Sequence, residues 1–133
     1  MRWDDLDRHQ PRLADRARKR LVDPGIALVV TIGRRDGTPR LSPVEPFVLD
    51  GRLWLSMMWQ SWKARDLLRD PRVLVHGIVT DRDGADGEVK VRGAARAEND
   101  RRRFAATPTP SARPSVGSPR SAGSICSRWT SRT

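Results

Sequence analysis

The sequence lacks a second cysteine, an extended apolar run and an apolar N-terminal segment. Cys126 is its only cysteine, which excludes an internal disulfide and a metal site built from several cysteines. No apolar stretch approaches the roughly 20 residues that a helix needs to cross a bilayer. The N-terminus also lacks the apolar core of a secretory signal. We therefore expect a cytoplasmic protein that makes no membrane contact.

Lysine is also scarce, although the formal net charge is +10. It occurs only at Lys19, Lys63 and Lys90, so arginine supplies nearly all of the positive charge. An arginine excess can indicate nucleic-acid binding, because guanidinium pairs well with phosphate. It can also reflect GC-rich coding, which favours arginine codons. We favour the second interpretation, because acidic residues alternate with the basic ones before the C-terminal tail and no continuous basic stripe forms.

The length and composition indicate one folded domain followed by a tail. A chain of 133 residues can form a single core. We place the domain at residues 1–104 and the tail at residues 105–133, where the composition changes. Within the domain, a charged helix is expected over about residues 3–23, because apolar side chains recur on one stripe. Asp23-Pro24-Gly25 ends it, and the helix is expected to cover one mouth of a barrel.

Five strands are expected over residues 26–99. The first is the apolar segment Ile26–Gly33, and the second and third, Thr38–Leu49 and Arg52–Met58, are joined by a tight turn at Asp50-Gly51. A short helix, Trp62–Arg69, separates them from strands at 73–80 and 88–98. The residues expected to face inward on the last strand are Val89, Val91, Gly93, Ala95 and Ala97. Short strands at regular spacing predict a mainly β fold, a small antiparallel barrel.

The start of the short helix has the features of a phosphate site. Ser61 is a plausible N-cap, and Lys63 lies in the first turn. The first N–H groups of a helix have no partner within the helix and lie at its positive end. Ser56, at the end of the preceding strand, could add a hydroxyl. Such helix starts bind phosphate. Spacing alone, however, favours an ordinary capped helix with a solvated lysine.

Landmarks along this region resemble the flavin-binding split-barrel family of the pyridoxamine 5′-phosphate oxidases and the deazaflavin-dependent reductases. They are Asp36-Gly37-Thr38-Pro39, then Ser42-Pro43-Val44, then Lys63 through Asp70-Pro71-Arg72-Val73, in the family's order. The similarity covers roughly residues 26–99. It implies a split β-barrel that forms a homodimer with cofactor sites at the subunit interface.

The resemblance also implies cofactor-binding residues. In such proteins the strand with Ser42, Pro43 and Val44 lies along the flavin, and Lys63 binds its phosphate. The family's strand-end pair falls on Leu55 and Ser56, and the helix start adds Ser61 and Trp62. The oxidases usually carry arginines where this chain has Ser42 and Trp62, which leaves fewer cations for the phosphate. FMN is the expected cofactor, and a deazaflavin is the alternative.

Three tryptophans, Trp54, Trp59 and Trp62, lie close together in the central segment. Such aromatic surface forms a core, a subunit interface or a platform for a planar ring, and a core or interface is the commoner outcome. His76 lies on an apolar strand without a second candidate ligand. We therefore expect it to be a buried side chain with its hydrogen bonds satisfied, and we predict no metal site.

The tail, residues 105–133, contains no acidic residue and has no hydrophobic periodicity, so it is expected to be irregular or disordered. An alternative interpretation is that a shift of the reading frame in the coding DNA produced this tail. Codons for Ser124 through Thr133 can be chosen so that a frame read two bases late encodes HLFAVDIED. The first aspartate of that string is forced, because Trp129 has one codon and Thr130 begins with AC. The shifted string resembles the closing strand of the split-barrel family.

The sequence therefore predicts a flavin-dependent oxidoreductase that transfers two electrons or a hydride to or from a small molecule of unknown identity. No side chain is a convincing general acid or base, so no catalytic residue is assigned. Oxidation of pyridoxamine phosphate is not expected, because the family's C-terminal substrate-binding segment has no counterpart here. Two alternatives stay open. One is a non-catalytic flavin or haem carrier or a truncated, inactive copy. The other is a basic nucleic-acid-binding protein.

Overall fold

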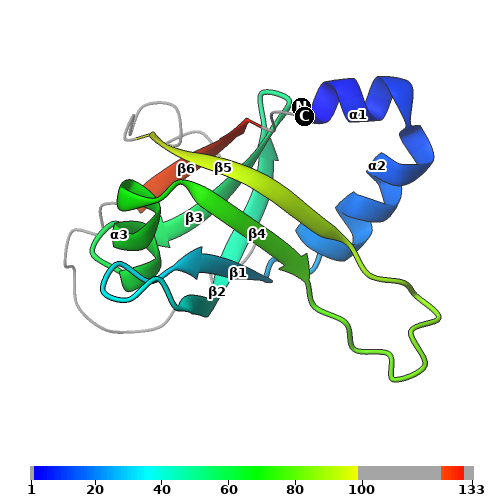
Figure 1. Cartoon of the computed structure of the whole chain (residues 1–133). Coiled ribbons are helices and arrows are strands. Elements are labelled where there is room, and N and C mark those ends of the chain that lie inside the picture. Colours follow the sequence, from blue (N-terminus) through cyan, green and yellow to red (C-terminus); the bar gives the residue numbers. More distant parts are fainter. Residues whose placement is uncertain (1, 99–123, 131–133) are drawn as a thin grey trace, which may run out of the picture.

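A computed structural model describes residues 2–98 and 124–130 of the chain. Helical segments come first, then five strands interrupted by one helix, then a final strand (Figure 1). Their bounds are α1 Trp3–His9, α2 Pro11–Ala17, the π-helical turn η1 Arg18–Val22, β1 Ala27–Ile32, β2 Pro39–Leu49, β3 Arg52–Met58, α3 Trp62–Arg69, β4 Arg72–Gly77, β5 Lys90–Glu98 and β6 Ser124–Thr130. No helix among the described residues is long and apolar enough to cross a membrane.

The strands close into an antiparallel barrel in the order β1-β2-β3-β6-β5-β4. The predicted mainly β split-barrel fold is confirmed, as is the helix between the third and fourth strands. The turn between β2 and β3 follows from its sequence. Asp50 and Gly51 have φ values of 52° and 66°, the left-handed region that glycine and aspartate accept and that a tight two-residue hairpin requires.

The helical segments lie at opposite ends of the barrel (Figure 1). The predicted N-terminal helix is interrupted at Gln10 and widens into the π-helical turn η1, and it covers one end, as expected. Leu21 of η1 is fully buried in the core, and the backbone N–H of Trp3 donates to Gly51 O at 2.8 Å. At the other end α3 contacts β1, β3 and β5. Ser61, Trp62 and Lys63, three of the predicted cofactor residues, lie at this second end.

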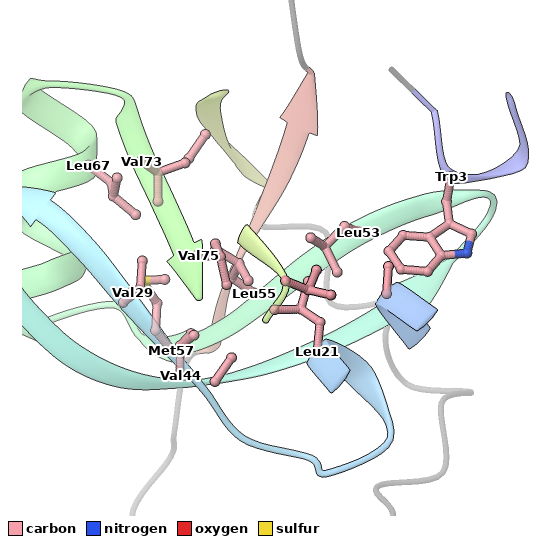
Figure 2. Close-up of a cluster of buried hydrophobic side chains, with 14 of the residues drawn as sticks. Trp3, Leu21, Val29, Val44, Leu53, Leu55, Met57, Leu67, Val73 and Val75 are labelled. Atoms are coloured by element: carbon pink, nitrogen blue, oxygen red, sulfur yellow. The ribbon is translucent and has the colours of Figure 1, made fainter. Parts of the chain in front are cut away.

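The core fills the barrel between the two helical ends (Figure 2). Val29, Leu55 and Val75 are fully buried and come from three different strands. On β3, Leu53, Leu55 and Met57 all belong to the core, and Trp54 between them is also fully buried. On β5 the expected inward set is only partly correct, since Ala95 is buried and Ala97 is exposed. The alternation on β5 therefore does not extend to its C-terminal end.

The expectation of an irregular tail is wrong for residues 124–130, which form β6. This strand pairs with β3 on one side and with β5 on the other. The physical reason is that both neighbours have unpaired backbone edges, and an extended chain of any composition can satisfy their N–H and C=O groups. Residues 105–123 and 131–133 of the predicted tail lie outside the described residues. The codon-shift interpretation concerns the coding DNA and stays a prediction.

Candidate functional site

The start of α3 is built as its sequence predicts. Ser61 is extended, and its Oγ accepts a hydrogen bond from Ala64 N at 3.3 Å while donating to Met58 O at 2.7 Å. The predicted N-cap is therefore confirmed. Within the described residues, nothing accepts from the backbone N–H groups of Trp62 and Lys63. These two donors are available to a ligand at the positive end of the helix.

Lys63 lies against strand β2. Its Nζ donates a hydrogen bond to Pro43 O, which joins the helix start to the Ser42-Pro43-Val44 segment. Partial burial lowers the pKa of the Lys63 ammonium from its ordinary value, because desolvation disfavours the charged form. The ammonium has three N–H donors, so one bond to Pro43 O leaves two for a ligand. Lys63 is therefore not the fully solvated lysine of the alternative interpretation.

The other predicted cofactor-binding residues differ in whether their side chains are buried in the core. Val44 is 3% exposed and Leu55 is fully buried, so both side chains belong to the core and only their backbone could face a ligand. Ser42 and Ser56 are half-buried, and Pro43 is exposed. In the sheet Ser42 pairs with Val29, and Ser56 pairs with Glu45. The structure thus joins Pro43 to the helix start directly, whereas among the described residues no side-chain hydrogen bond joins Ser42 or Ser56 to it.

An apolar outer face of the sheet adjoins Pro43. Val30 is paired with Leu41 on one side and with Leu74 on the other, and Leu28 is paired with Pro43. Leu41 is 63% exposed. A cavity of about 530 Å³ lies over this face, where Val30, Ile32, Leu74 and Ala94 meet Arg72 and Arg92. A flat or apolar group could be covered here without displacing the core.

A buried carboxylate behind the helix start was not predicted. Asp66 is fully buried and accepts hydrogen bonds from Thr31 Oγ1 at 2.9 Å, Arg40 Nε at 2.7 Å and Arg34 N at 3.3 Å. The available sequence signal was Thr31, the one polar side chain in an otherwise apolar strand. Because buried hydroxyls require a partner, that residue indicated a polar contact inside the barrel.

The three tryptophans do not share one environment. Trp54 is fully buried and stacks on Phe47 at 6.5 Å between ring centroids. Trp59 and Trp62 are 51% and 54% exposed. The guanidinium carbons of Arg40 and Arg65 lie 5.6 and 5.4 Å from the centre of the Trp62 ring, within the range of cation–π attraction. Trp62 therefore forms an exposed aromatic wall beside two cations.

His76 is hydrogen-bonded through both ring nitrogens, as expected of a satisfied histidine. Nδ1 lies 2.5 Å from Gly77 O, and Nε2 lies 3.2 Å from Glu88 Oε2. The imidazole is therefore held by its own strand end and by the segment before β5. In residues 2–98 and 124–130, no group of three or more histidine, cysteine, aspartate or glutamate side chains is arranged to hold a metal.

The sequence matches a family model. The model is described as pyridoxamine 5′-phosphate oxidase, and it matches residues 13–118 of this chain, which is most of its length. The chain belongs to the pyridoxamine 5′-phosphate oxidase family. The resemblance stated from the motifs between Asp36 and Val73 is thereby confirmed. A comparison with curated protein sequences gave no match.

Several solved structures have a similar fold. One is a conserved hypothetical protein of Mycobacterium tuberculosis, which is 22% identical and gives a TM-score of 0.64. The match covers 93% of this chain and 81% of that protein. An F420 reductase gives 20% identity, a TM-score of 0.56, and coverage of 86% and 93%. A protein of unknown function from Agrobacterium tumefaciens gives 16% identity, a TM-score of 0.58, and coverage of 80% and 48%. This chain thus spans about half of the last. At such identities the likeness shows the fold alone.

Proposed function

We propose that this member of the family binds a flavin-type cofactor and transfers two electrons or a hydride to or from a small molecule. The observation that carries the proposal is the hydrogen bond from Lys63 Nζ to Pro43 O. It brings the cation of the helix start against the strand that, by resemblance, lies along the flavin ring. A phosphate at the helix and a ring on β2 would then be parts of one site.

The donors at the helix start have the chemistry that a phosphate monoester requires. They are the backbone N–H groups of Trp62 and Lys63 and the remaining N–H bonds of the Lys63 ammonium, all at the positive end of α3. The hydroxyl of Ser56 on β3 is a further candidate. Ser61 holds the helix start in shape, because its Oγ already caps Ala64 N. The residues therefore fit a single phosphate group.

The ring would lie along β2 at Ser42 and Pro43, next to the exposed apolar side chains of the outer face. When bound, a flavin or deazaflavin supplies the hydride chemistry, while the protein supplies position and electrostatics. Burial of the ring against Leu41 would exclude water from one side of it. We propose FMN as the cofactor and keep a deazaflavin as the alternative, which the likeness to an F420 reductase supports.

We further propose that the outer face formed by Val30, Leu41 and Leu74 packs against a second copy of the chain. The family resemblance implies a homodimer with cofactor sites at its interface, and exposed apolar area of this kind is typical of subunit contacts. A dimer there would bury Leu41 and complete the enclosure of the ring. Sedimentation velocity of the purified protein, with and without FMN, tests this proposal.

Lys63→Ala should weaken cofactor binding by about ten- to a hundredfold, because a charge-assisted contact contributes roughly 1.5–3 kcal/mol. The measurement is calorimetric titration of FMN and of a deazaflavin. Lys90→Ala is the matched control, since Lys90 is an exposed lysine at the start of β5 that pairs with Glu88. Equal affinities for wild type and Lys63→Ala would disprove the phosphate site, and failure of both cofactors to bind would disprove the flavin proposal.

Cofactor affinity should fall with rising pH, and it should do so at a lower pH than for an exposed lysine. The pKa of Lys63 in the free protein is lowered by burial, so the protein loses this proton earlier as pH rises. A bound phosphate favours the protonated form, and affinity therefore declines as pH passes through the pKa of the free protein. Titrations of wild type and Lys63→Arg across alkaline pH measure this. Parallel profiles for the two would show that Lys63 is not the titrating group.

A second candidate is a non-catalytic carrier or an inactive copy with a frameshifted C-terminus. The observation that favours it is the register of β6. Ser127 is paired with the fully buried Leu55, and Arg128 is paired with Arg96. A barrel strand normally alternates with an apolar face, and the sequence of β6, SICSRWT, does not alternate in that way. Sequencing the coding DNA from independent isolates tests it, because an intact frame with this same tail would exclude the frameshift.

A further inference from the structure

The loop between β1 and β2 encloses a second pocket, which we call the hairpin pocket. It has a volume of about 450 Å³ and is lined by Arg34, Arg35, Asp36, Arg40 and Trp62, with backbone from Gly33 and Pro39. This volume lies within the range of small-molecule sites. Neither Lys63 nor Ser61 belongs to it, but Trp62 does, so the hairpin pocket adjoins the phosphate site proposed above.

The charge of the hairpin pocket is strongly positive. Three arginines face one carboxylate, Asp36, and that carboxylate accepts a hydrogen bond from Thr38 N at 2.9 Å. The same bond lowers the pKa of Asp36, so the group stays ionised and turned into the hairpin. Arg34 and Arg35 are exposed, and in the described part of the chain no acidic side chain pairs with either. Arg40 is paired with Asp66, so the uncompensated positive charge of the lining comes from Arg34 and Arg35.

Arg40 is fixed in a way that leaves its outer edge available. Its Nε donates to Asp66 Oδ2 at 2.7 Å, and Asp66 is itself fully buried and held by Thr31. Within the described residues no acceptor takes the Nη groups of Arg40. A guanidinium whose Nε is anchored from behind presents two further donors in a set direction, which suits bidentate contact with phosphate oxygens.

Trp62 gives the pocket an aromatic wall. Its ring is 54% exposed, and the nearby guanidinium groups of Arg40 and Arg65 keep it beside the positive charge. Exposed tryptophan next to arginine is a combination that accommodates a planar organic group attached to an anion. The aromatic side of the pocket therefore comes from the first residue of α3.

We propose that the hairpin pocket binds the diphosphate group of a nucleoside diphosphate, with Arg34, Arg35 and Arg40 on the phosphates and Trp62 beside the base. The two hairpin guanidinium groups and the Nη groups of Arg40 supply donors for the oxygens of more than one phosphate. The paired loop arginines approach from the hairpin, and Arg40 approaches from strand β2, so two neighbouring phosphates can each contact a guanidinium. This site does not depend on flavin binding at Lys63.

The test is calorimetric titration of the full chain with ADP, inorganic pyrophosphate and adenosine at constant ionic strength. ADP and pyrophosphate should bind, and adenosine should bind at least tenfold more weakly than ADP. The variant Arg34→Ala/Arg35→Ala should weaken ADP binding by roughly ten- to a hundredfold. Both side chains are exposed, so this variant should fold. Arg8→Ala/Arg12→Ala, two exposed helical arginines, is the matched control for net charge and should bind ADP as wild type does.

Three results would overturn the proposal. Equal binding of ADP and adenosine would mean that the phosphates make no contact. Equal weakening in the two double-arginine variants would mean that net charge alone attracts ADP. Weakening by Lys63→Ala without an effect of Arg34→Ala/Arg35→Ala would assign ADP to the helix start. FMN affinity is expected to be unchanged in Arg34→Ala/Arg35→Ala, so failure of the hairpin site and failure of the flavin site give different results.

Discussion

Replacing Asp66 with alanine should lower the free energy of unfolding by about 3 kcal/mol or more. The carboxylate is fully buried and receives three hydrogen bonds. Its removal leaves the buried Thr31 hydroxyl without an acceptor, which costs about 1–3 kcal/mol. It also leaves the Nε of Arg40 facing an apolar space. Arg40 is 38% exposed and can turn toward water, which limits the loss from the charge itself.

Urea unfolding followed by tryptophan fluorescence measures this change. Asp83→Ala, in the exposed loop before β5, is the matched control and should alter stability by less than about 0.5 kcal/mol. Thr31→Val in both backgrounds gives a double-mutant cycle. The valine should destabilise the wild type but have little effect when Asp66 is already alanine. A loss below about 1 kcal/mol for Asp66→Ala would mean that the buried carboxylate does not hold the β1–β2 hairpin to α3.

The burial of Asp66 could not be predicted from the sequence. Its partners Thr31, Arg34 and Arg40 are 35, 32 and 26 positions away. A charged residue in a short helix is normally solvated, and only the closed barrel brings β1 and β2 close enough to cover it. Burial of a charge depends on such distant contacts, so spacing within α3 carried no information about it.

Local features, in contrast, were predicted well. The β2–β3 turn requires positive φ at Asp50 and Gly51, and residue type alone indicates that. The bounds of α3 follow from Ser61, whose side chain caps the first turn, and from Asp70-Pro71, where the helix ends. These outcomes depend on a few consecutive residues, which is why alternation and turn chemistry were sufficient for the first five strands.

The candidate site could be predicted only in part. The helix start and Lys63 could be predicted from local rules together with the family resemblance. The contact of Lys63 with Pro43 could not, because it depends on how α3 packs over the barrel end. The burial of Val44 and Leu55 likewise depends on which face of each strand turns inward. Alternation defines two faces without saying which one the core takes.

Removing residues 124–133 should abolish cooperative unfolding and cause aggregation. The barrel closes only through β6, which pairs with five residues of β3, Trp54–Met58, and with five of β5, Ala94–Glu98. Without it both strands become exposed edges with unpaired backbone groups, and such edges recruit other chains. Size-exclusion chromatography and thermal unfolding of the shortened chain measure the two effects. An unchanged melting transition would mean that the barrel is stable without β6.

Two further variants separate the role of the strand from the role of its sequence. Removal of residues 131–133 alone is the control and should leave the transition in place, since β6 ends at Thr130. Replacing residues 124–132 with HLFAVDIED should raise the free energy of unfolding by a few kcal/mol, because each buried apolar side chain contributes about 1.5–3 kcal/mol. That string alternates apolar residues, whereas the present register sets Ser127 opposite Leu55. A replacement that is no more stable than the original would remove the physical argument for a shifted reading frame, because the closing strand would then derive its stability from backbone pairing alone.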